Sequence, residues 1–88
     1  MKDIKELWNE MMEAEKRSDM LDEAWAEDPE NEEIEAEWDE AYADYWNSFN
    51  AVAAEIERMS RKAIDKATAA KLISERRERM GELIAALV

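Results

Sequence analysis

Residues 29–60, PENEEIEAEWDEAYADYWNSFNAVAAEIERMS, carry the longest helical pattern in the chain. Apolar side chains recur there every three or four residues, which is the spacing of one face of an α-helix. They are Ile34, Trp38, Ala41, Tyr45, Phe49, Val52, Ile56 and Met59. Pro29 suits the first position of a helix, and Asp28 before it is expected to cap the free amides. The pattern predicts a helix over residues 29–60.

The sequence on either side predicts two further helices. Before it, apolar residues at helical spacing run from Ile4 to Trp25, and Asp3 and Glu6 have the spacing of a capping box. This pattern predicts a helix over residues 4–27. After it, Asp65 is a candidate cap for a helix over residues 65–87. We expect a break near residue 64, although a continuous helix from residue 29 is the alternative because residues 60–68 contain no Gly or Pro.

The composition agrees with an all-α protein. The chain has 88 residues, of which 47% are hydrophobic and 41% charged, with one Gly and one Pro. A chain of this length forms one domain at most. Because turn-rich β folds need Gly, Pro and Asn at their turns, the expected fold is a three-helix bundle, or an elongated helical hairpin with a third helix alongside.

Several kinds of chemistry are excluded by the residues that are missing. Without Cys and His the chain has no thiolate, no imidazole base and no disulfide. No nucleophile motif or Gly-rich phosphate loop is present, so the sequence predicts no enzyme, no cofactor and no metal site. A carboxylate-only site for a divalent metal ion is left open as an alternative. No secretory signal or apolar run of roughly 20 residues is present, so a cytoplasmic protein is expected.

Charge is distributed unevenly along the chain. The formal net charge is −12. Residues 1–57 hold twenty acidic and four basic residues, whereas residues 58–88 hold four acidic and eight basic ones. A surface designed only for solubility has both signs interspersed. The asymmetry therefore favours a negative surface that a positively charged partner recognises.

The candidate binding residues lie on the predicted central helix. Its acids form two flanks beside the apolar face. One flank contains Glu33, Glu37, Glu40 and Asp44, and the other contains Glu32, Glu35 and Asp39. Tyr42 and Trp46 lie at the edge of the apolar stripe and are expected to contact a partner, whereas Trp38 and Tyr45 are expected in the core. Arg76, Arg77 and Arg79 form a secondary basic patch. Most other bases of residues 58–88, which we call the tail, are expected to pair with acids of the first two helices.

The length, the lack of Cys and His, and the acid-only stretch containing Trp25, Trp38, Tyr42 and Trp46 resemble a class of proteins. The chain is similar to small acidic phage-encoded inhibitors of host defence, including DNA mimics and anti-CRISPR proteins. The resemblance implies a non-enzymatic protein of the host cytosol that occludes a basic nucleic-acid-binding protein, such as a CRISPR effector, without binding nucleic acid or membrane itself. The alternative is a self-assembling structural or adaptor protein, for example a homodimer with acids and bases paired between protomers.

Overall fold

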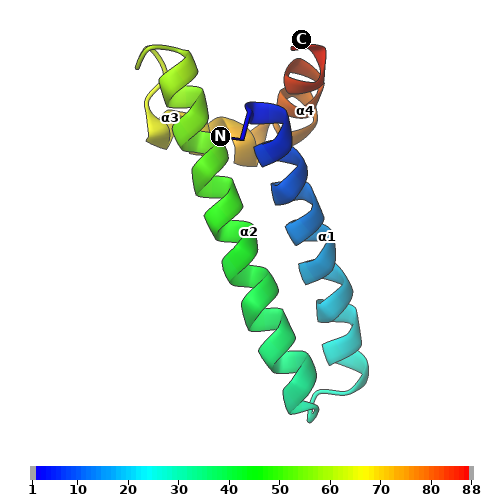
Figure 1. Ribbon diagram of the computed structural model, residues 1–88. Coiled ribbons are helices and arrows are strands. Elements are labelled where there is room, and N and C mark those ends of the chain that lie inside the picture. Colours follow the sequence, from blue (N-terminus) through cyan, green and yellow to red (C-terminus); the bar gives the residue numbers. More distant parts are fainter. Residues whose placement is uncertain (1, 88) are drawn as a thin grey trace.

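The computed structural model describes residues 2–87, and these form four helices and no strand. α1 (Ile4–Glu27) and α2 (Glu32–Met59) are antiparallel and form a long hairpin, whereas α3 (Lys66–Glu75) and α4 (Arg77–Ala86) lie across one of its ends (Figure 1). α3 packs on α2, and α4 packs on α1. The molecule measures 47 × 25 × 20 Å. The expected all-α fold is confirmed, and its form is the hairpin rather than a compact bundle.

Side-chain caps fix the start of the first three helices. Asp3 Oδ1 accepts a hydrogen bond from the Glu6 amide at 2.9 Å, as the capping pattern predicts. Asp65 Oδ1 accepts from the Thr68 amide at 2.7 Å, and this bond lowers the pKa of the Asp65 carboxyl. The predicted break near residue 64 is therefore confirmed, since α2 ends at Met59 and α3 begins at Lys66. Arg61 and Lys62 have φ angles of 55° and 66°, in the left-handed region, which turns the chain out of α2.

The predicted start of α2 at residue 29 is wrong. The cap is Asn31, whose side-chain oxygen accepts from the amides of Glu33 and Ile34 at 3.0 and 3.4 Å. Asp28 instead accepts a hydrogen bond from the Asn31 side-chain amide, and Pro29 lies in the connecting turn. Since Asn caps a helix about as well as Asp, the choice between them depends on the turn geometry and not on propensity.

The single helix predicted over residues 65–87 is two helices, which meet at Arg76. The apolar residues Ala69 and Ile73 belong to α3, which packs on α2, whereas Ile84 belongs to α4, which packs on α1. A straight helix cannot reach both partners, and the chain bends between them. Arg77 supports the bend, because its Nε donates a hydrogen bond to the Ile73 carbonyl at 3.2 Å.

The core lies at the end of the hairpin that α3 and α4 cover, which we call the near end. Its buried residues are Ile4, Trp8, Met11, Phe49, Val52, Ala53, Ala69, Ile73 and Ile84. Met11, Val52 and Ile73 are enclosed completely. We call residues 18–46, which form the other end, the distal half. Among them Ala41 is the one buried residue, so this half contributes little to the core.

Gly81→Ala is expected to raise the free energy of unfolding by about 0.5–1 kcal/mol, because Ala is the better helix former. A Cβ at this position would lie 3.4 Å from the nearest atom of the Trp8 ring, which is ordinary contact. Urea denaturation measures the change. Gly81→Val is the control, because its larger side chain would press on Trp8 and is expected to destabilise. A Gly81→Ala protein less stable than the parent would contradict this packing.

Candidate functional site: an acidic and aromatic face on the hairpin

The distal half of the hairpin carries acidic residues and no Lys or Arg. The bases of the tail do not reach it. Of the tail residues that form ion pairs in the described part of the chain, Arg58 pairs with Glu55, Arg79 with Glu82 and Arg77 with Glu15. Of the tail bases expected to pair with the first two helices, Arg58 does so, within α2 itself, whereas Arg61, Lys62, Lys66 and Lys71 form no ion pair within residues 2–87. Arg77, which was predicted to belong to the basic patch, pairs with α1. No acidic residue between positions 18 and 40 forms an ion pair with any other residue in the range 2–87.

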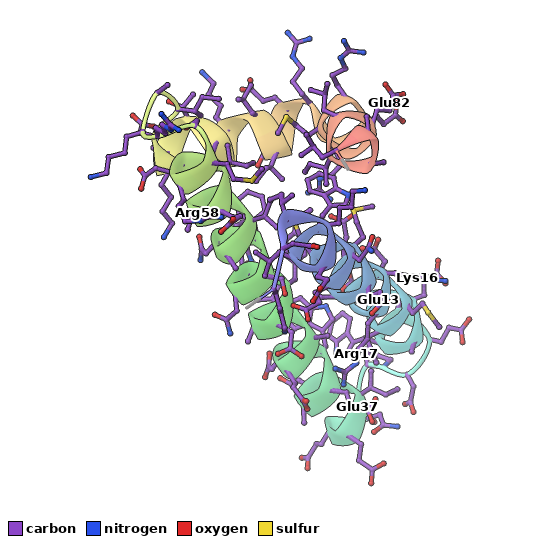
Figure 2. All side chains as sticks on the ribbon, turned by 45° about the horizontal axis from the view of Figure 1, so that its top comes forward. Glu13, Lys16, Arg17, Glu37, Arg58 and Glu82 are labelled. Atoms are coloured by element: carbon purple, nitrogen blue, oxygen red, sulfur yellow. The ribbon has the colours of Figure 1, made fainter. Side chains whose placement is uncertain are left out.

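The two acidic flanks of α2 have different surroundings. Glu37 shares a groove with Lys16 and Arg17 of α1, and Figure 2 shows these residues on the same side of the hairpin. Asp44 lies 3.7 Å from the Arg17 guanidinium, with both side chains about half exposed. Glu33 and Glu40 fall on this same side of α2, because a helix has 3.6 residues per turn. Asp44, one of the predicted partner-binding residues, is therefore already partly neutralised by a base of α1.

The other flank adjoins the aromatic side chains. Trp38 stacks on Tyr42 with ring centroids 5.0 Å apart, and Tyr42 meets Trp46 edge-on at 6.1 Å. Tyr42 and Trp46 are 45% and 41% exposed, which agrees with their predicted place beside the core. Trp38 and Tyr45, both expected in the core, are only partly buried. Tyr45 packs against the core cluster, whereas Trp38 does not belong to it because it lies in the distal half. Together these rings form a ridge along α2.

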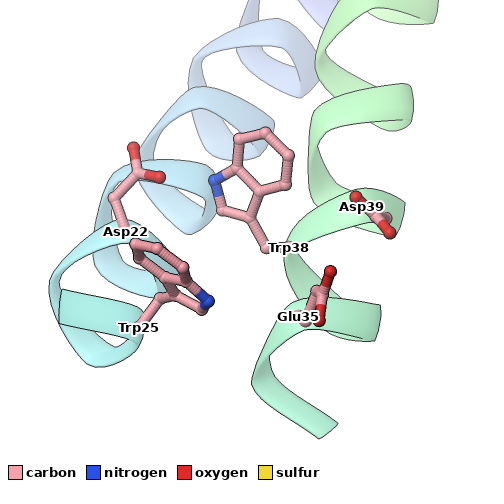
Figure 3. A pocket seen from close by; sticks show the side chains of 5 residues that line it. All are labelled: Asp22, Trp25, Glu35, Trp38 and Asp39. Carbon is pink, nitrogen blue, oxygen red and sulfur yellow. The ribbon is translucent and has the colours of Figure 1, made fainter. Parts of the chain in front are cut away.

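Figure 3 shows a pocket where this ridge meets α1 near the tip of the hairpin. Its lining is two indole rings, Trp25 and Trp38, and three carboxylates, Asp22, Glu35 and Asp39. The pocket has a volume of about 260 Å³. The indole N–H of Trp38 is buried and has no hydrogen-bond acceptor among the described residues. Buried donors without an acceptor are uncommon. The exposed lining of the pocket is mostly apolar, with the carboxylates at its margin.

We call the combined surface the acidic-aromatic face. Its residues are Asp22, Trp25, Glu32, Glu35, Trp38, Asp39, Tyr42 and Trp46. The sequence prediction missed three of them as site residues: Asp22 and Trp25, because both lie on α1, and Trp38, which was expected in the core. Trp25 is 46% exposed although its helical spacing is that of a core residue. Its position at the uncovered end of the hairpin explains the exposure.

No protein-family model, curated protein or solved structure matches this chain. Its possible chemistry therefore has to be judged from the residues that the structure brings together. Within residues 2–87, no group of three or more acidic, His or Cys side chains is arranged to hold a metal ion. No helix in that range is both long and apolar enough to cross a membrane.

Arg77 does not belong to an exposed basic patch with Arg76 and Arg79. Its side chain is 25% exposed, and its guanidinium pairs with Glu15 of α1 and donates to the Tyr45 hydroxyl of α2 at 2.7 Å. Burial opposes its charge, but the hydrogen bonds to Glu15 and Tyr45 outweigh burial, so the pKa of Arg77 is raised. The guanidinium carbon also lies 5.9 Å from the centroid of the Tyr45 ring. Arg77 thus joins the short helices to the hairpin, and Arg76 and Arg79 remain exposed.

Arg77→Leu is expected to lower the free energy of unfolding by about 1–2 kcal/mol, because it removes charge-assisted hydrogen bonds to two helices. Arg76→Leu is the matched control: its side chain is exposed and its loss is expected to change stability by less than about 0.5 kcal/mol. Urea denaturation of both variants makes the comparison. Equal effects from the two substitutions would show that Arg77 does not join the helices.

Proposed function

We propose that this chain is a non-enzymatic acidic binding protein that occludes the nucleic-acid-binding cleft of a basic protein. In this proposal it acts in the cytosol of a host cell as a phage anti-defence inhibitor, of which an anti-CRISPR protein is one example. The acidic-aromatic face would occupy the Arg- and Lys-lined surface that otherwise holds phosphates. The chain itself would bind neither nucleic acid nor membrane.

The observation that carries the proposal is that carboxylates and exposed aromatic rings share one side of the hairpin, with no base among them. Glu32, Glu35 and Asp39 follow one another at intervals of about 5 Å along the helix axis. Like charges at this spacing repel one another and destabilise a helix, and a Lys at any of them would relieve that repulsion. Their common field would steer a basic partner into contact and raise its association rate.

The aromatic ridge would supply binding free energy that charge alone does not provide. Surface ion pairs contribute little net affinity, whereas Trp and Tyr side chains dominate the energetics of many interfaces. Tyr42, Trp46 and Trp25 are each more than 40% exposed and lie beside the carboxylates. The face therefore combines groups that attract a cationic surface with groups that gain free energy when they are buried against it.

A self-assembling adaptor is the second candidate, and the separation of charge along the molecule favours it. The acids occupy the distal half, whereas Arg61, Lys62, Lys66 and Arg76 are exposed on the segments that lie at the near end. Two copies arranged head to tail would bring opposite charges together. Size-exclusion chromatography with light scattering distinguishes the candidates. A stable oligomer that dissociates at high salt supports the adaptor, and a monomer at all salt concentrations supports the inhibitor.

The inhibitor is tested by capture and displacement. The immobilised chain is incubated with a bacterial lysate, and the bound proteins are eluted with salt and identified. Each one is then tested for binding to its nucleic acid in the presence of the chain. The proposal expects a captured protein that releases its nucleic acid as the chain is added. Captured proteins that keep their nucleic acid bound would contradict it.

A further inference from the structure

Arg77 shows how this hairpin holds a guanidinium group. A carboxylate from α1, Glu15, pairs with it, and the hydroxyl of Tyr45 on α2 accepts a hydrogen bond from it, with the ring centroid 5.9 Å from the guanidinium carbon. Arg suits such a position because its planar cation stacks on rings and pairs with carboxylates. The arrangement spans the seam between the two antiparallel helices.

A carboxylate of α1 and an aromatic ring of α2 recur one heptad closer to the tip, although the Trp38 ring has no hydroxyl to accept a hydrogen bond. Asp22 lies seven residues after Glu15 on α1, and Trp38 lies seven residues before Tyr45 on α2. Because the helices are antiparallel, both steps lead about 10 Å in the same direction along the hairpin. Asp22 and Trp38 are both walls of the pocket in Figure 3, together with Trp25, Glu35 and Asp39.

No Lys or Arg among residues 2–87 lies beside Asp22 and Trp38 in the way that Arg77 lies beside Glu15 and Tyr45. Residues 18–57 contain no Lys or Arg, and none of the ion pairs in the described range involves Asp22, Glu35 or Asp39. The volume of about 260 Å³ lies just below the roughly 300 Å³ at which pockets for drug-sized ligands begin. It is suited to a single side chain.

We propose that the pocket formed by Asp22, Trp25, Glu35, Trp38 and Asp39 accepts an arginine side chain of the protein partner. The inference rests on the proposed function and names the group that the acidic-aromatic face recognises. The guanidinium lies against the indole rings and pairs with the carboxylates, as the Arg77 guanidinium pairs with Glu15 beside the Tyr45 ring. An arginine that binds here is withdrawn from the phosphates that it would otherwise contact.

The test uses N-acetyl-arginine amide as the probe, with the indole N–H signals of the ¹⁵N-labelled full chain observed by NMR. We expect saturable shifts of the Trp25 and Trp38 signals with a dissociation constant on the order of a few millimolar, and small shifts at Trp8. N-acetyl-citrulline amide, a neutral molecule of the same shape, is expected to give no saturable shift. N-acetyl-lysine amide is expected to bind at least about threefold more weakly, because an ammonium pairs less well with rings and paired carboxylates.

Two variants with the same change in net charge separate the pocket from the general negative field. D22N/E35Q/D39N keeps the shape of the pocket and removes its charge, and is expected to weaken binding of the arginine probe at least about tenfold. E33Q/E37Q/E40Q changes the opposite flank and is expected to weaken it less than about twofold. Circular dichroism confirms that both variants keep the helical content of the parent.

Three results would overturn the pocket: equal losses in the two variants, citrulline binding as tight as arginine, or lysine binding tighter than arginine. These results would not contradict the proposed function, because the displacement of nucleic acid does not depend on which residue of the partner the pocket binds. Conversely, tight arginine binding without displacement of nucleic acid from a captured partner would contradict the proposed function and keep the pocket.

Discussion

Replacing four carboxylates of the acidic-aromatic face, in the variant D22N/E32Q/E35Q/D39N, is expected to lower affinity for the captured basic partner at least about 100-fold at low ionic strength. Removing the charges slows the steered encounter and removes close charge pairs from the complex. Surface plasmon resonance with the partner immobilised gives both rate constants. We expect the larger part of the loss in the association rate.

The matched control changes four acids on the other flank of α2, in the variant E33Q/E37Q/E40Q/D44N. Its net charge is the same, but Lys16 and Arg17 lie beside this flank and Asp44 already pairs with Arg17. We expect a loss of affinity of less than about tenfold. If the two variants lost affinity equally, total charge and not the acidic-aromatic face would determine binding.

Ile73→Ala is expected to lower the free energy of unfolding by about 3 kcal/mol, which is the usual result of truncating an enclosed aliphatic side chain. Ile73 is completely buried and belongs to α3, the helix that closes the core over α2. A domain of this size has a total stability of roughly 4–13 kcal/mol, so the loss is a large part of it. Urea denaturation followed by circular dichroism measures the change.

Ile34→Ala is the control for that measurement, because it removes the same atoms from a half-buried position in the distal half. Ile34→Ala is expected to lower the free energy of unfolding by about 1 kcal/mol, because less apolar surface is lost from a half-buried side chain. A loss at Ile34 as large as that at Ile73 would mean that the distal half has a core of its own.

The helices of this chain could be predicted from the sequence because their apolar periodicity is strong and their caps are local. Asp3 and Asp65 act within three residues of their own positions, and the capping pattern is readable without knowledge of the tertiary structure. The bend at Arg76 could not be predicted, since no Gly or Pro is present there. It arises because Ile73 and Ile84 pack on different helices, which is a property of the assembled fold.

The site was predictable in part for a similar reason. Helical geometry separates the two acidic flanks of α2 and places Tyr42 and Trp46 beside one of them. It does not show which flank faces the bases of α1, nor that Asp22 and Trp25 complete a pocket with Trp38. The position of Arg77 could not be predicted either, because its partners Glu15 and Tyr45 are 30 residues apart in the sequence and lie on different helices.

The fold separates the buried core from the exposed negative charge along the length of the molecule. The near end holds nearly all of the buried side chains, whereas the distal half presents repelling carboxylates and half-exposed rings. Segments with few buried contacts are the first to open. We expect the distal half to be the part that adapts to a partner, while the near end keeps the hairpin folded.

The salt dependence of binding shows whether the negative charge of the distal half determines the affinity for a partner. The affinity of the chain for its captured basic partner is measured by isothermal calorimetry from about 50 mM to about 500 mM salt, since charges on exposed surfaces are screened over this range. If the partner recognises the uncompensated charge of the distal half, the dissociation constant rises at least about 100-fold between the lowest and the highest salt concentration. A dissociation constant that stays the same at both ends of the range would contradict the account.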